Sequence, residues 1–154
     1  MDGVNEPVDP KRENRELIEL LNELRILLPG VQVLFAFLLT VPLTGRFAGL
    51  SDFEKGMYLC AFFASAAAAV MLTAPTAFHR IQWRRGDKEA LLLVSNRLAV
   101  AGLGFLAVAM VAVVGLVSNL VTSNGLALLL TAGVAVIIVV LWFAIPIWHR
   151  EHEG

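Results

Sequence analysis

The sequence has little charge and almost no cysteine. Of its 154 residues, 16% are charged and 58% are hydrophobic, and Cys60 is the one cysteine. Soluble domains average roughly 45–50% apolar and 25% charged residues, so this composition indicates a membrane protein and excludes a disordered chain. A single cysteine excludes an internal disulfide and a metal cluster built from cysteine alone. The net charge of -1 excludes a nucleic-acid-binding protein that relies on bulk positive charge.

Long charge-free runs dominate the rest of the sequence. A helix that crosses a bilayer needs about 20 apolar residues, because the hydrocarbon core is about 30 Å thick. Three runs meet this length, and a fourth, from Val31 to Gly45, is shorter. The fourth run either crosses by borrowing neighbouring leucines or forms a re-entrant segment, which would leave three spans. We predict four spans in a transmembrane domain of residues 29–148, at about 29–46, 57–78, 98–119 and 125–148.

Basic residues are distributed unevenly over the predicted loops. Ten of the 12 Lys and Arg residues fall before the first span, between the second and third spans, or in the C-terminal tail. Only Arg46 and Lys55 fall on the other side. Because basic loops stay in the cytoplasm, this distribution predicts a multi-pass protein of the cell (inner) membrane with both termini cytoplasmic. An even number of spans requires the same arrangement, so four spans are favoured over three.

The segment before the first span has the pattern of an amphipathic helix. Residues 1–10 are typical of a disordered tail, and residues 11–28 place leucines three and four positions apart, on one helical face. Pro29 and Gly30 predict the end of this helix. Two interpretations stay open: the helix lies on the inner leaflet, or it forms a short helical bundle with a partner. The face offered to a partner helix consists of Leu17, Leu20, Leu21, Leu24 and Leu28.

The predicted spans contain no Asp, Glu, Lys, Arg or His in their interiors. Proton pumps and ion-coupled transporters usually keep such groups at membrane depth, and intramembrane hydrolysis needs a base beside its nucleophile. We therefore expect no enzymatic activity, no catalytic residue, no cofactor and no metal site. The polar side chains Gln32, Thr40 and Thr44 of the first span either line a pore formed by several copies or hydrogen-bond between the helices of one bundle.

Two further groups of residues are expected to make contacts. Cys60, Ala64 and Ala68 are spaced four residues apart, and small side chains let membrane helices approach closely, which predicts a helix-packing face. On that face, Cys60 is expected to be a buried and unreactive thiol. The basic loop after the second span is expected to contact lipid head groups or a partner. Its candidate residues are Arg80, Arg84, Arg85 and Lys88.

Three stretches of the chain carry a resemblance to a known family. They are RELIELLNELR, PGVQVLFAFLLTVPLTGRF and TAPTAFHR. They resemble a family of small four-span membrane proteins from actinobacteria, which is catalogued as a domain of unknown function. The resemblance covers the chain from Arg15 to about Trp148. It implies four spans with a helix before the first, and it implies no activity, substrate or catalytic residue.

These features predict an all-α protein: an integral membrane four-helix bundle, preceded by a cytoplasmic amphipathic helix and followed by a cytoplasmic tail at residues 149–154. The expected function is non-enzymatic. It consists of self-assembly, or assembly with a membrane-protein partner, through the N-terminal helix and the basic inner loop. The alternative is a homo-oligomeric channel for ions or small solutes, lined by the first span. Membrane lipid is an expected partner, and nucleic acid is not.

Overall fold

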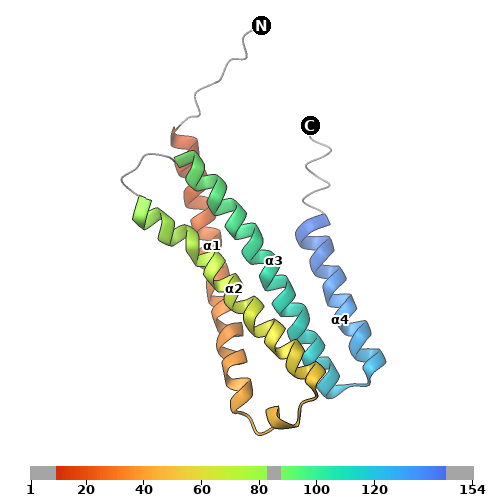
Figure 1. Ribbon diagram of the computed structural model, residues 1–154. Coiled ribbons are helices and arrows are strands. Elements are labelled where there is room, and N and C mark those ends of the chain that lie inside the picture. The colour runs from red at the N-terminus through yellow and green to blue at the C-terminus, as the bar shows by residue number, and fades with distance from the viewer. Residues whose placement is uncertain (1–9, 83–87, 145–154) are drawn as a thin grey trace.

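The part of the chain that the structure describes folds into four long helices, which Figure 1 shows as α1 to α4. The computed structural model describes residues 10–82 and 88–144. The helices are α1 (Pro10–Thr40), α2 (Asp52–Gln82), α3 (Lys88–Val121) and α4 (Asn124–Val139). Two 3-10 turns, η1 (Val41–Leu43) and η2 (Phe47–Gly49), connect α1 to α2, and a π-helical turn, η3 (Val140–Ala144), extends α4. The described residues form no β-strand, so the predicted all-α class is confirmed.

All four helices are long and apolar enough to cross a membrane. Their apolar segments are Ile18–Leu43, Asp52–Phe78, Leu92–Val121 and Asn124–Trp142. The 26 residues of the first segment span about 39 Å at about 1.5 Å per residue. This segment includes Glu19, Glu23 and Arg25, and its charge-free part from Ile26 to Leu43 reaches about 27 Å, close to the roughly 30 Å of a hydrocarbon core. The expected four apolar helices are confirmed among the described residues.

α1 continues through Pro29 and Gly30, where the sequence predicted its end. That prediction was wrong. A proline removes the hydrogen bond of its own N–H, but it does not remove the packing of the turns on either side. Leu24 before the proline and Val31 after it are buried in the same cluster with α2 and α3. The amphipathic segment and the first span are therefore one continuous helix of 31 residues.

α2 and α3 form the centre of the molecule (Figure 1). α1 packs against both of them, and α4 packs against α3. The short connections make consecutive helices antiparallel, so α1 begins and α4 ends at the same end of the molecule. If each of these four helices crosses the bilayer, the start of α1 and the end of α4 lie on the same side of the membrane.

Two clusters of buried side chains hold the helices together. The first cluster consists of Leu24, Val31, Ala68, Leu72, Ala99 and Leu106. The second consists of Leu38, Tyr58, Ala61 and Leu116. Both clusters combine residues of α1, α2 and α3, whereas α4 itself buries only Ala127 and Ile138 among its described residues. Trp142 of η3 packs against the first cluster and so attaches the far end of this last segment to the core.

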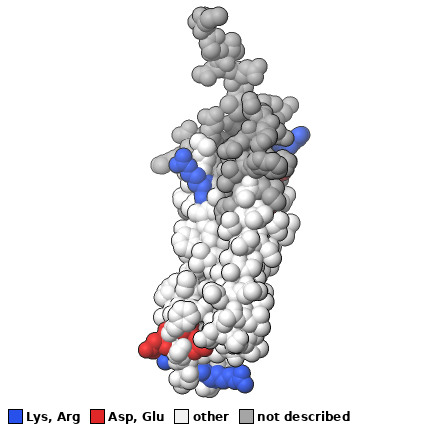
Figure 2. All heavy atoms as spheres, turned by 90° about the vertical axis from the view of Figure 1, so that its right-hand side faces the viewer, with Lys and Arg blue, Asp and Glu red and all other residues white. Residues whose placement is uncertain are grey.

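Charged side chains lie toward the two ends of the molecule, and the face shown in Figure 2 has no charged side chain among the described residues between them. Many large apolar side chains of the four helices are exposed there or on the other faces, among them Phe37, Phe63 and Leu128. Exposed charges toward the end where α1 begins are Arg15, Glu19, Glu23, Arg25 and Arg97. At the opposite end, Arg46 and Asp52 are exposed. An apolar band between two charged ends is the surface expected of a chain that crosses a bilayer.

Candidate interaction surfaces

The leucine face of α1 is covered inside the chain. Leu24 is only 3% exposed, in a cluster with Leu72 of α2 and Ala99 of α3. The other described leucines of this face are half-buried: Leu20, Leu21 and Leu28. The side chain of Leu17 lies outside the described residues. Packing against α2 and α3 thus already uses Leu24 and partly covers Leu20 and Leu28, and the binding of a partner helix through this face stays a prediction.

The packing face of α2 consists of small side chains, but Cys60 is not among them. Ala64 and Ala68 are buried, together with Ala61 and Ser65. Cys60 is exposed. At about 100° per residue, Cys60 lies roughly 90° from the middle of the buried face, whereas its neighbour Ala61 lies close to the middle. The expectation of a buried thiol is therefore corrected, and Cys60 belongs to the outer surface of the bundle.

Two glycines of α3 allow the neighbouring helices to approach closely. A Cβ atom on Gly102 would lie 2.9 Å from Cγ and from Cδ2 of Leu72 in α2. A Cβ atom on Gly115 would collide with Met57 of α2 and would lie 3.3 Å from Cγ2 and Oγ1 of Thr131 in α4. Both glycines are buried. The contact of α3 with α2 thus depends on the absence of a side chain at Gly102, whereas at Gly115 the flexible end of Met57 can move aside.

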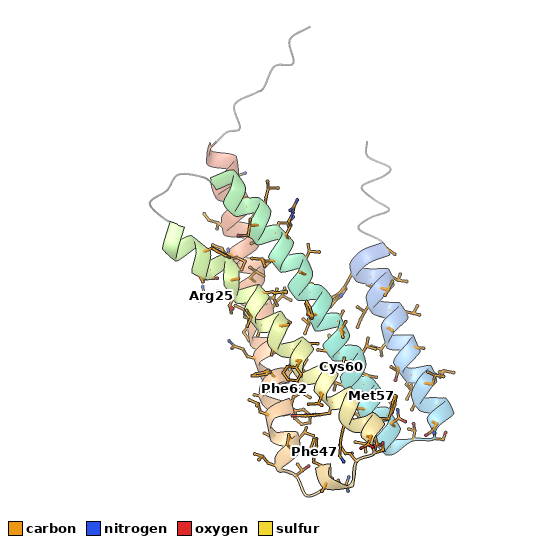
Figure 3. The ribbon with its side chains drawn as sticks, in the orientation of Figure 1. Arg25, Phe47, Met57, Cys60 and Phe62 are labelled. Atoms are coloured by element: carbon orange, nitrogen blue, oxygen red, sulfur yellow. The ribbon has the colours of Figure 1, made fainter. Side chains whose placement is uncertain are left out.

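An aromatic cluster joins α1, η2 and α2. Phe35 stacks on Phe62 with ring centroids 5.1 Å apart, and Tyr58 stacks on the same ring at 6.1 Å. Phe47 of η2 meets Tyr58 edge to face at 5.1 Å. Figure 3 shows Phe47 in the loop below Phe62. This cluster packs the loop between α1 and α2 against the end of the bundle.

Tyr58 also completes the hydrogen bonding of α1. Its hydroxyl donates to the carbonyl oxygen of Leu38 at 2.9 Å. In an α-helix that carbonyl accepts from the N–H of residue 42, and Pro42 has no N–H. The buried tyrosine therefore replaces the missing donor. Sequence reasoning missed this pair, although a proline near the end of a helix was a signal that one carbonyl needed another donor.

The polar side chains of the first span lie outside the contacts between helices. Gln32, Thr40 and Thr44 are all exposed, which corrects the expectation that they bond between the helices of one bundle. Thr40 donates to the carbonyl of Phe37 and Thr44 to that of Val41, each at 2.7 Å. Among the described residues no comparable bond is formed by the Gln32 amide. Gln32 is thus the one of the three whose side chain faces outward without a local partner among the described residues.

Most of the predicted basic contact residues lie outside what the structure describes. Arg84 and Arg85 lie outside the described residues, as do the side chains of Arg80 and Lys88.

The described residues contain no group of three or more His, Cys, Asp or Glu that could hold a metal ion. An open hollow of about 300 Å³ lies between α1 and α3. Three leucines and one amide line it: Leu20, Leu92, Leu93 and Asn96.

The fold and its surface define the class of the protein. Four apolar helices, with the described charges toward two ends of the molecule, make a multi-pass, all-helical membrane protein. The chain belongs to the family of unknown function DUF6328, whose sequence profile matches residues 7–146. The expected membership of a family of unknown function is thereby confirmed. No curated protein and no solved structure matches the chain.

Proposed function

We propose that the protein is a non-enzymatic assembly protein of the cell membrane, which binds copies of itself or another membrane protein. The observation that supports this proposal is the peripheral position of α1 and α4. Only 11% of the spanning residues of each are buried inside the chain, against 33% for α2 and 28% for α3. Most side chains of α1 and α4 in the spanning segments are therefore available to neighbours within the bilayer.

Orientation is part of the proposal. We place both termini in the cytoplasm, because ten of the 12 basic residues fall on that side of the predicted spans. The start of α1 and the end of α4 share one end of the molecule, which is consistent with this placement. The basic loop, with Arg80, Arg84, Arg85 and Lys88, then contacts anionic head groups or the cytoplasmic part of a partner. An actinobacterial source stays a prediction.

The mass of the protein in a lipid nanodisc tests the proposal directly. Native mass spectrometry of the tagged chain is expected to show two or more copies. If it shows one copy, affinity purification from native membranes in a mild detergent is expected to recover a membrane-protein partner in stoichiometric amount. A chain that is monomeric in nanodiscs and recovers no stoichiometric partner contradicts an assembly function.

A homo-oligomeric channel is the alternative proposal, and the exposure of two polar side chains favours it. Gln32 and Thr40 are exposed on α1 and lie within roughly 80° of each other around the helix axis. Several copies arranged with these residues toward a common axis would line a narrow polar path. Proteoliposomes that contain the chain are then expected to pass ions or small solutes faster than empty liposomes. Flux equal to that of empty liposomes contradicts the channel.

A further inference from the structure

An exposed stripe runs along α1 beside the face that packs on α2 and α3. The stripe consists of Pro29, Gln32, Ala36 and Leu39, all exposed. These positions alternate three and four residues apart, which is the spacing of a seam between two helices that cross at a small angle. The buried residues Val31 and Leu38 lie on the face of α1 that packs against the other helices. Gln32 and Ala36 lie about 100° and 140° from the middle of that buried face.

Gln32 is the residue of the stripe that needs a partner. It lies inside the apolar segment Ile18–Leu43, seven residues and about 10 Å beyond Arg25 along the helix. A primary amide at that depth has no water to bond with, and lipid tails offer neither a donor nor an acceptor. Thr40 and Thr44 have no such need, because their hydroxyls donate to carbonyls of their own turns.

An amide is complementary to a second amide, because each has both a donor and an acceptor. A two-fold axis along the membrane normal brings the same residue of two copies together and keeps both copies in the same orientation. Ala36, one turn further along, is small enough for two helices to approach closely beside the amides. Lipid alone satisfies neither group of the amide, so the chemistry favours a protein neighbour.

We propose that a second copy of this chain binds along the Gln32 stripe of α1, with the two Gln32 amides hydrogen-bonded across the interface. This inference rests on the proposed assembly function and names its partner and its contact. It also replaces the leucine face of α1 as the surface for association, since that face is covered by α2 and α3. The dimer is symmetric and parallel, and its centre lies within the apolar part of α1.

Disulfide cross-linking locates the interface. The single native thiol is first removed by Cys60→Ala, which changes an exposed residue. In that background, Ala36→Cys in nanodiscs is expected to form a covalent dimer under mild oxidation. Ala132→Cys on α4 is the matched control, because Ala132 is also an exposed alanine of an apolar helix. Cross-linking of Ala132→Cys in preference to Ala36→Cys overturns the proposal.

The role of the amide is tested by energy transfer between labelled copies in liposomes. Gln32→Leu is expected to weaken dimerisation about tenfold, the effect of losing an interhelical hydrogen bond of ordinary strength. Gln32→Asn, which keeps the amide, is expected to retain most of the affinity. Thr73→Val is the control, since Thr73 is exposed on α2 and its hydroxyl bonds to the carbonyls of Ala69 and Val70. Helical content by circular dichroism is expected to stay unchanged in all three variants.

The outcomes separate this inference from the proposed function. Dimers of unchanged affinity in Gln32→Leu overturn the inference and leave an assembly function standing. A monomeric chain that co-purifies with a different membrane protein also overturns the inference and leaves an assembly function standing. A monomeric chain without any stoichiometric partner overturns both.

Discussion

Glycines 102 and 104 of α3 are two residues apart and differ in what surrounds them. A Cβ atom on Gly102 would lie 2.9 Å from two atoms of Leu72, a side chain that is fully buried and has little room to move. A Cβ atom on Gly104 would meet nothing within 4 Å. The difference arises from the position of α2, because both glycines lie in regular helix.

We expect Gly102→Ala to lower the free energy of unfolding by about 1–3 kcal/mol, since the new methyl group forces Leu72 or the α2–α3 contact to shift. Gly104→Ala is the matched control and is expected to leave that free energy unchanged or slightly higher, because alanine is the better helix former. Reversible unfolding in bicelles measures both variants. Equal destabilisation by the two substitutions would show that the α2–α3 contact is looser than described.

The hydrogen bond from Tyr58 to the Leu38 carbonyl is the second residue-scale test. Tyr58→Phe leaves a buried carbonyl without a donor, which costs about 1–3 kcal/mol of unfolding free energy. Pro42→Ala supplies an N–H to the same turn, so the cost of Tyr58→Phe is expected to be smaller in that background. The four unfolding free energies of this double-mutant cycle give the coupling. Strict additivity would mean that Tyr58 does not replace the donor missing from Pro42.

At the scale of elements, α1 is a single helix whose first half already belongs to the bundle. Leu24 lies before Pro29 and is buried with residues of α2 and α3, whereas Ile26, two positions on, is 79% exposed. A separate cytoplasmic helix would have left both side chains to a partner or to the membrane surface. The burial of Leu24 therefore distinguishes the two architectures.

Leu24→Ala is expected to lower the free energy of unfolding by about 2–5 kcal/mol, because it opens a cavity in a packed cluster. Ile26→Ala is the matched control and is expected to change that free energy little. Unfolding of the purified chain in bicelles, without any partner present, is the measurement. A Leu24→Ala protein as stable as the Ile26→Ala protein would return the leucine face to a role in partner binding.

The start of α2 shows a local signal that sequence reasoning missed. The backbone N–H and the hydroxyl of Ser51 both donate to Oε2 of Glu54 at 2.7 Å, and the N–H of Glu54 donates to Oγ of Ser51 at 3.3 Å. This is the reciprocal cap that a serine followed three positions later by a glutamate makes at a helix N-terminus. It explains why α2 begins at Asp52, ahead of the predicted span that starts at Met57.

At the scale of the whole molecule, the described residues contain four apolar helices, and this even number predicts the sides of the loops. In the Cys60→Ala background, Arg46→Cys is expected to react with a membrane-impermeant maleimide added outside intact cells. Arg15→Cys is expected to react only after the membrane is made permeable, because ten of the 12 basic residues lie on its side. Equal reactivity of the two positions in intact cells would indicate that the first apolar segment re-enters rather than crosses.

Local composition predicted much of the fold, but it did not predict which surfaces of the helices are buried and which are exposed. Apolar runs predicted four long helices because a helix in lipid must satisfy its own backbone and expose apolar side chains. Pro29 misled the prediction of a helix end, since the packing of Leu24 and Val31 into one cluster outweighs one lost hydrogen bond. Cys60 was misplaced because four-residue spacing drifts around a helix of 3.6 residues per turn.

The amino-acid sequence by itself determined that this protein enters a membrane, how many apolar helices it has, and which residues are polar within them. These properties depend on each segment's own side chains and on the thickness of the bilayer. Only the tertiary structure decided which faces are used: the leucines of α1 are covered, Tyr58 bonds to Leu38, and Gln32 is left outward. The physical reason is that burial depends on neighbours brought together from distant parts of the chain, and no local pattern specifies them.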